Sequence, residues 1–332
     1  MITKKSIMRH ICLISALLFF CKFPYEPINE PPVIVAPADT SITTDIIVNK
    51  IAPGSQICNP SISQDTTNFP GCMLWLNFSG SLPVKTDSST RDYSVTGALQ
   101  HDRLTITDNS NTVRWFMMKD LFSPDPDIQF QDPEWSAHPE YIGSLIGDAD
   151  IADSWSFLAI HPITSHYLKI IDKRLYETST PHLWVDQSAS HPQHVNSDIT
   201  YDKNGLVNVE AIQEFFGTTK VKIVYSVKEN DRLKLYYVDF SSHPVVPIRL
   251  QQPLGDDKKN WFFESALISP DGEWTVYNGW PSSTQYSVFI QKLTSQSNPI
   301  LLKEGASDPH WWVNPQSHQL FVLYNIISGD NR

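Results

Sequence analysis

The chain has 332 residues, of which 18% are charged and 11% are aromatic, and it contains 24 prolines, 10 tryptophans and 12 tyrosines. This length can bury a substantial core, and a composition rich in turn formers and aromatic rings favours many short strands over long helices. The formal net charge of −11 argues against nucleic acid as a partner, because phosphate binding needs a basic face.

The first 21 residues have the pattern of an export signal. An apolar run from Ile11 to Phe20 is too short to cross a membrane and suits the hydrophobic part of a signal peptide. Three basic residues precede it, namely Lys4, Lys5 and Arg9. We therefore expect an exported protein that resides in the periplasm or at the outer-membrane surface.

Cys21 follows the apolar run directly, and a Pro-rich stretch opens residues 22–54. This arrangement resembles that of a bacterial lipoprotein, in which such a cysteine is acylated and a tether leads to the folded domain. Leu18 fits the acylation motif, whereas Phe19 and Phe20 stand where small residues are expected, so ordinary cleavage and an uncleaved anchor are the alternatives. The resemblance implies lipidation of Cys21 and membrane contact only through an N-terminal lipid or signal anchor.

Two cysteines, Cys58 and Cys72, lie in the body of the chain on either side of a polar turn at residues 64–68. If the flanking segments are neighbouring antiparallel strands, the two residues can come within bridging range, which predicts a disulfide in an exported protein. The alternative is a pair of small buried thiols. No Cys-x-x-Cys pair is present, and we expect neither a metal site nor a cofactor.

The most specific local pattern is a tight turn followed by a strand. Pro270 presets φ at the first turn position, Asp271 can bond its own backbone, and Gly272 accepts a positive φ. A strand is expected from Trp274, and a second one over Tyr286–Leu293. The structural turn thus comprises Ser269, Pro270, Asp271, Gly272 and Trp274.

Degraded copies of this element begin at Asn59, Asp132, Thr180 and Asp308. Trp135 and Trp184 lie 49 positions apart, and Leu267 and Trp311 lie 44 apart. Both intervals are close to the roughly 40–45 residues of a four-stranded propeller blade.

The interval between Trp184 and Leu267 has room for one more blade. An alternating hairpin over Val221–Val227 and Leu233–Phe240 would supply its strands. Only Val209–Phe216 is expected to be helical, as a short helix in a loop between blades, outside the core.

The turn and its copies resemble the SPDG repeat of TolB-like β-propellers, which belong to the WD40-like class. The resemblance implies an all-β fold over residues 55–332, a β-propeller of five or six four-stranded antiparallel blades. After Arg332 no closing strand is evident, so Val33–Ala36 or Asp45–Val48 could close the ring, and the alternative is an incomplete propeller truncated from a longer protein. The repeat order is also similar to that of uncharacterised envelope lipoproteins.

No nucleophile elbow, Walker motif or dinucleotide fingerprint is present, so we expect no catalytic residues. The expected function is a non-catalytic binding or scaffolding module of the bacterial cell envelope, which engages a protein or polysaccharide partner through propeller loops. The alternatives are a carbohydrate-active enzyme and a truncated member of a larger lipoprotein family. Carboxylates converging at the channel would favour hydrolysis, whereas a channel of main chain and small side chains would favour binding.

Three further features have competing explanations. His191 and His194 could hold Zn²⁺, although His-Pro pairs along the chain favour a turn-flanking role. The acidic run from Asp148 to Asp153 could hold Ca²⁺, although it lacks the ligands of an EF-hand, and a solvated loop is favoured. Trp311 and Trp312 could form a sugar platform, but core packing is the more common use of tryptophan.

Overall fold

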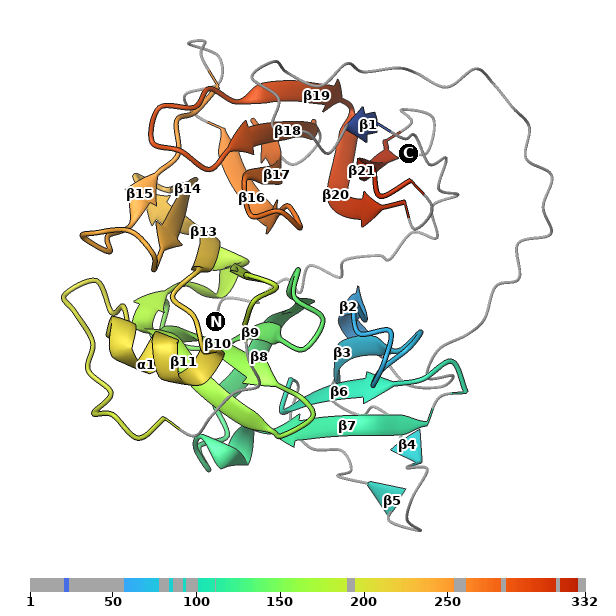
Figure 1. The fold of residues 1–332 in the computed structure, drawn as a ribbon, viewed down its shortest axis with the longest axis vertical. Helices are drawn as coiled ribbons and strands as arrows, with labels where there is room; N and C mark the ends of the chain where they lie inside the picture. The colour runs from blue at the N-terminus through green and yellow to red at the C-terminus, as the bar shows by residue number, and fades with distance from the viewer. Residues whose placement is uncertain are drawn as a thin grey trace, which may run out of the picture.

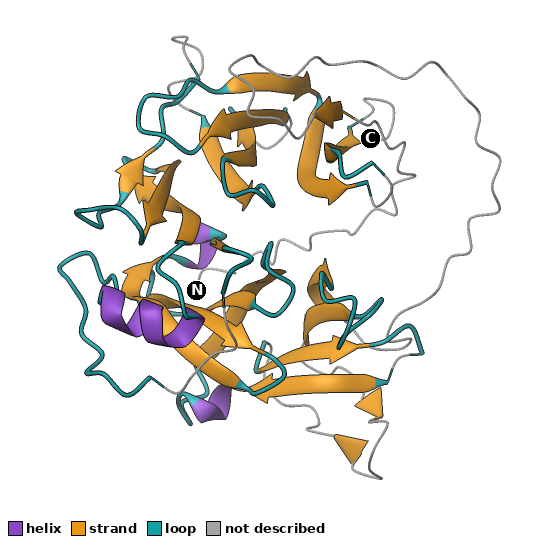
Figure 2. Cartoon of the chain, in the orientation of Figure 1, coloured by secondary structure: helices purple, strands orange, loops and turns teal. Residues whose placement is uncertain are grey.

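The computed structural model describes residues 21–23, 57–77, 84–85, 92–93, 101–110, 112–189, 195–253, 261–281, 285–314 and 317–327. In these ranges strands dominate, with one α-helix and two short 3-10 helices, η1 (Lys119–Leu121) and η2 (Glu177–Ser179) (Figure 2). The all-β prediction is therefore confirmed.

Five antiparallel sheets follow one another in chain order around a common centre (Figure 1). Sheet 1 contains β2 (Ile57–Ile62), β3 (Met73–Asn77), β6 (Arg103–Thr107) and β7 (Val113–Met118). Sheet 2 contains β8 (Ile128–Trp135), β9 (Ile142–Asp148), β10 (Trp155–His161) and β11 (His166–Leu175). Sheet 3 contains β12 (His182–Val185), β13 (Val221–Glu229), β14 (Arg232–Asp239) and β15 (Ile248–Arg249). Sheet 4 contains β16 (Phe262–Ile268), β17 (Trp274–Trp280), β18 (Ser287–Lys292) and β19 (Ile300–Glu304).

Sheet 5 has three strands, β20 (Ala306–Val313), β21 (Leu320–Ile326) and β1 (Cys21–Phe23). β1 pairs antiparallel with β21, with Cys21 opposite Val322. A separate two-stranded sheet joins β4 (Val84–Lys85) to β5 (Asp92–Tyr93). The closing strands expected over residues 33–36 and 45–48 lie outside the described residues.

The propeller thus has four complete four-stranded blades and a three-stranded fifth sheet. The predicted hairpin is present as β13 and β14, but it does not form an additional blade. His182 pairs with Val224, so β12 and β13 belong to one sheet. The long interval between those two strands instead contains the single helix, α1 (Val209–Phe216).

α1 forms where the sequence predicts it, but it is part of the core and not a loop helix outside it. Its buried side chains are Ala211, Ile212, Phe215 and Phe216. Their spacing places them on one face, which packs against sheets 2 and 3. Gly217 ends the helix in a left-handed conformation, and its N–H bonds to the carbonyl of Gln213.

Apolar clusters hold successive sheets together. Sheets 1 and 2 share a cluster that includes Leu74 and Phe130, and sheets 2 and 3 share one that includes Phe157 and Ile223. Further clusters join sheet 3 to sheet 4 and sheet 4 to sheet 5. Because each small sheet buries an apolar face against its neighbour, burial of about 25 cal/mol per Å² of apolar surface is the main force that keeps this ring of sheets together.

The SPDG turn connects β16 to β17 and has the predicted chemistry. The N–H of Ser269 bonds to the carbonyl of Trp274 at 2.8 Å, and the N–H of Gly272 bonds to the carbonyl of Ser269 at 2.8 Å. The turn also docks on the preceding blade, because Nε1 of Trp184 donates to the carbonyl of Pro270 at 3.0 Å. Trp184 is therefore a connector between sheets 3 and 4.

Cys72 is a buried free thiol, so the predicted disulfide with Cys58 is not formed. In the hairpin of β2 and β3, Cys58 lies opposite Leu76. Cys72 instead lies near Ser63, because the N–H of Ser63 bonds to the carbonyl of Cys72. At about 3.3 Å per residue, this register places the two cysteines at opposite ends of the hairpin, too far apart for a bridge. Burial, the largest cause, and the charge of Asp108 raise the pKa of the Cys72 thiol.

The close contact between the turn and Trp184 predicts that Gly272→Ala is strongly destabilising. Gly272 has φ of +74°, and an added Cβ would lie 2.5 Å from the indole of Trp184. We expect the free energy of unfolding in urea to fall by roughly 2–4 kcal/mol.

Gly71→Ala is the matched control. Gly71 has φ of +66°, but a Cβ there would meet nothing within 4 Å. This variant should lose only about 1–2 kcal/mol, the backbone cost alone. Equal losses in the two variants would show that the turn does not depend on contact with Trp184.

Candidate functional site: the axial pocket

The same backbone irregularity recurs near the start of every sheet. Five non-glycine residues there have positive φ: Asn59, Asp132, Thr180, Ser265 and Asp308. In sheets 1, 2, 4 and 5 this residue coincides with a break in strand register, as in a β-bulge, and in sheet 3 it lies two residues before the first strand. A proline follows in four of the five cases, where the bulge tolerates a residue without an N–H.

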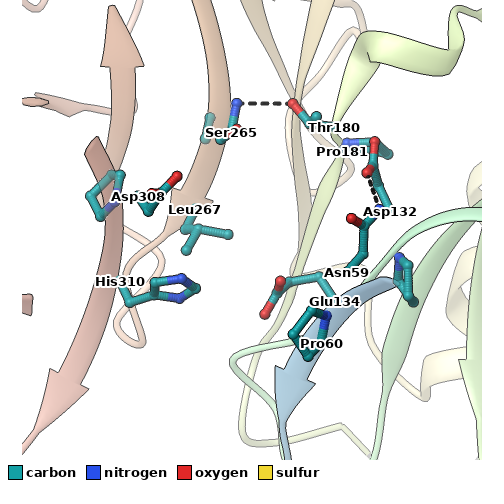
Figure 3. A pocket seen from close by; sticks show the side chains of 13 residues that line it. Asn59, Pro60, Asp132, Glu134, Thr180, Pro181, Ser265, Leu267, Asp308 and His310 are labelled. Carbon is teal, nitrogen blue, oxygen red and sulfur yellow. Dashed lines mark hydrogen bonds between the residues drawn. The ribbon is translucent and has the colours of Figure 1, made fainter. Parts of the chain in front are cut away.

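These bulges surround a cavity of about 280 Å³ to which all five sheets contribute. The lining residues are Asn59, Pro60, Asp132, Pro133, Glu134, Thr180, Pro181, Ser265, Ala266, Leu267, Asp308, Pro309 and His310. They occupy equivalent positions on the innermost strands, and Figure 3 shows them facing a common space. We call this cavity the axial pocket.

Asp132 carries a strongly perturbed carboxyl group. Burial, the largest cause, and the negative charges of Glu177, Glu264 and Glu134 raise its pKa to about 7. Its Oδ1 accepts a hydrogen bond of 2.7 Å from Nδ2 of Asn59 on the neighbouring sheet (Figure 3). A substantial fraction of this group is therefore neutral near pH 7.

Glu134 lies two residues further along β8 and is held by sheet 1. The hydroxyl of Ser61 donates to its Oε1 at 2.6 Å and accepts the N–H of Trp135 at 2.9 Å. Burial raises the pKa of Glu134, and the His310 imidazole opposes this effect. In Figure 3, Glu134 and His310 extend toward each other from opposite sides of the pocket.

His182 is a structural residue beside the pocket. Its Nδ1 accepts the N–H of Ile268 at 3.0 Å, and it also hydrogen-bonds the backbone of Trp135, so it links sheets 2, 3 and 4. Burial lowers the pKa of this imidazole to about 3, which keeps it neutral. Thr180 makes a similar link, since its Oγ1 accepts the N–H of Ser265 at 2.9 Å.

The structure separates the other candidate residues from this pocket. The acidic run follows β9 as a turn in which Asp150 and Asp153 are exposed. Trp311 donates from Nε1 to the carbonyl of Leu267 at 2.8 Å, whereas Trp312 is 37% exposed, so the pair splits between two faces as alternation predicts. The proposed zinc ligands His191 and His194 lie outside the described residues.

Metal-binding clusters and membrane-spanning helices are both absent from the described ranges. No cluster of three or more His, Cys, Asp or Glu side chains in them is arranged to hold a metal ion. None of the helices described there has the length and apolar character needed to cross a membrane.

Comparison with known proteins bears on the fold alone. No family model matches the chain, and no curated protein matches its sequence. Among solved structures, a prolyl endopeptidase aligns with 83% of this chain at 10% identity and a TM-score of 0.39, over 33% of its own length. Puromycin hydrolase aligns with 83% at 12% identity and a TM-score of 0.35, over 34% of its length. TolB from Acinetobacter baumannii aligns with 78% at 11% identity and a TM-score of 0.29, over 65% of its length.

This chain therefore spans about a third of the length of the prolyl endopeptidase and of puromycin hydrolase. The expected propeller fold is confirmed by the arrangement of the sheets, and two TolB proteins are among the similar structures. Similarity to envelope lipoproteins is not among these findings and remains a prediction.

The prediction of a non-catalytic binding or scaffolding module is wrong where it excludes catalysis. Enzymes, a prolyl endopeptidase and puromycin hydrolase, are among the similar structures, so this propeller arrangement is no evidence against catalysis. The channel also differs from the lining of main chain and small side chains that would have favoured that role, because Asp132, Glu134, Asp308 and His310 reach it. The sequence signal for this convergence is that Asp132 and Asp308 begin two of the degraded repeat copies, although their Asp-Pro-Glu and Asp-Pro-His strings carry no recognisable functional motif.

The crowding of carboxyl groups predicts that Asp132→Asn stabilises the protein at alkaline pH. The pKa of Asp132 is about 7 when folded and about 4 when unfolded, so the native state loses stability as pH rises from 4 through 7. The side-chain amide of the Asp132→Asn variant still accepts the hydrogen bond from Asn59, but it does not ionise and so does not lose stability as pH rises. We expect the free energy of unfolding to rise on the order of 1–2 kcal/mol at pH 8 and to be unchanged at pH 4.

Asp150→Asn is the control for the change in net charge, because it alters an exposed carboxylate outside the pocket. Urea unfolding at both pH values measures the effect. A variant at Asp132 that is less stable than the wild type at pH 8 would contradict the charge repulsion described above.

Proposed function

We propose that the axial pocket binds an organic cation, such as a guanidinium or ammonium group. The observation that carries this proposal is the charge of the lining: three carboxyl groups, those of Asp132, Glu134 and Asp308, and no lysine or arginine. Glu177 and Glu264 add negative potential, since both act on Asp132.

Low-dielectric walls strengthen the field of these carboxylates inside the pocket. The apolar surface between the acidic groups comes from Pro133, Pro181, Pro309 and Leu267. A cation that enters therefore loses water, but it meets carboxylates from two sheets, on β8 in sheet 2 and on β20 in sheet 5. Hydrogen bonds between a charged donor and a carboxylate are about twice as strong as neutral ones. A planar guanidinium group can bond several of them at once.

The size of the pocket agrees with an organic group. A water molecule occupies about 30 Å³ of liquid, so a cavity of about 280 Å³ accepts a group of several heavy atoms. Either a small free cation or the basic side chain of a peptide satisfies this requirement.

The proposed setting is outside the cytoplasm. The basic and apolar pattern of residues 1–20 supports export, and acylation of Cys21 would attach the protein to a membrane surface. An envelope protein or polysaccharide as the source of the ligand remains a prediction. Mass spectrometry of the natural protein tests lipidation directly.

A matched pair of probes tests cation binding. N-acetylarginine amide carries one guanidinium charge, and N-acetylcitrulline amide is its neutral isostere. At pH 8 and low salt, calorimetry should show binding of the arginine probe and binding of the citrulline probe that is at least about tenfold weaker, a difference of roughly 1.4 kcal/mol.

Glu134→Gln and Asp308→Asn should each weaken binding of the arginine probe by about tenfold. Asp150→Asn removes the same charge from the exposed loop and should leave the affinity nearly unchanged. If neither probe binds, or if both bind equally, the proposed function is wrong.

Acid–base chemistry on the bound ligand is a second candidate function. It is favoured by one observation, the pairing of Asp132, whose pKa is about 7, with the carboxyl group of Glu134. Two carboxyl groups in different environments can serve as general acid and base. We expect hydrolysis of arginine p-nitroanilides to be measurable in the wild type and lost in Asp132→Asn; activity retained in that variant would exclude this chemistry.

A further inference from the structure

We propose that the axial pocket exchanges a proton for its cation, so that ligand binding ionises the carboxyl group of Asp132. This inference rests on the proposed function and adds how the site is regulated.

The geometry around Asp132 explains why an empty pocket retains a proton. Like charges act on this carboxyl group from three elements: Glu134 on β8, Glu177 in η2 and Glu264 on β16. From β2 it receives only a neutral hydrogen bond, donated by Asn59. Because burial and like charge both oppose ionisation, the neutral form is favoured until an opposite charge arrives.

The remaining groups that face the pocket come from β20. Asp308 adds a third carboxyl group to the lining, and His310 acts electrostatically on Glu134. A bound cation would interact with the Asp132, Glu134 and Asp308 carboxylates together, which removes the cost of ionising the last of them. Every cause that acts on Asp132 favours its neutral form, whereas His310, Ser61 and the Trp135 N–H favour the ionised form of Glu134, so the proton leaves from Asp132.

The neighbouring His182 does not supply this proton. Its Nδ1 accepts the N–H of Ile268, and burial keeps the pKa of this imidazole near 3, so it is neutral throughout the relevant range. His310 is the other imidazole that faces the pocket, and a variant at this position separates its contribution from that of Asp132.

Linkage gives the expected pH dependence. Above the pKa of Asp132 the carboxylate is already formed and affinity is constant, whereas below it each bound cation must displace a proton. With N-acetylarginine amide, whose charge is fixed in this range, Kd should be about tenfold higher at pH 6 than at pH 8. About half a proton per ligand should be released at pH 7, and nearly one at pH 6.

Calorimetry in phosphate and in Tris measures the released proton, because the two buffers differ in ionisation enthalpy. Asp132→Asn should abolish both the release and the pH dependence of Kd, whereas Asp308→Asn should weaken binding but keep both. His310→Gln should keep both as well. Thermal unfolding and circular dichroism at each pH confirm that every variant is folded.

The outcomes separate the two proposals. Binding at pH 8 with no proton release at pH 6 would overturn the exchange and leave cation binding intact. Release that persists in Asp132→Asn and disappears in His310→Gln would also overturn it, since the proton would then belong to the imidazole. Absence of binding at pH 8 would contradict both the proton exchange and the cation binding on which it rests.

Discussion

The left-handed bulge near the start of each sheet determines what this propeller can do. Asn59, Asp132, Thr180, Ser265 and Asp308 adopt this conformation in succession, although none is a glycine. For an L-residue it costs about 1–2 kcal/mol each, so contacts elsewhere must hold the bulges in place. Several of these contacts are hydrogen bonds between sheets, such as those between Asn59 and Asp132 and between Thr180 and Ser265.

Stability and charge are divided between different parts of each sheet. The faces that pack on neighbouring blades are apolar, as in the cluster of Phe263, Tyr277 and Phe289 between sheets 3 and 4. The inner edges instead bring Asp132 and Glu134 close together, where burial raises the pKa of both. The ring can accept this cost because apolar burial of each blade is far larger than the cost of one or two poorly solvated carboxyl groups.

Local features of this fold were predictable from the sequence. The turn at Ser269, the hairpin of β13 and β14 and the helix at Val209 each depend on residues close together in the chain, and their periodicity is evident. Properties that depend on residues far apart in the chain were not predictable. The missing disulfide follows from strand register, and the absent extra blade follows from the pairing of β12 with β13 across a long insertion. The repeat copies placed Asn59, Asp132, Thr180 and Asp308 at equivalent positions, but an Asp-Pro pair is typical of an ordinary turn, so the bulges and the pocket that they line were not predicted.

The tryptophans show how one repeated residue serves both packing and the site. Trp184 in sheet 3 donates to the SPDG turn of sheet 4, and Trp311 in sheet 5 donates to the carbonyl of Leu267 in sheet 4. The second of these bonds reaches a residue that lines the axial pocket, so the same contact that joins two blades also fixes a wall of the cavity. Asp132 and Glu134 both lie on β8 and are held by hydrogen bonds from Asn59 and Ser61 of sheet 1, which keeps these two carboxyl groups from moving apart to relieve their repulsion. The repulsion must then be relieved by a proton or by a bound cation, which makes ligand and proton competitors for one site.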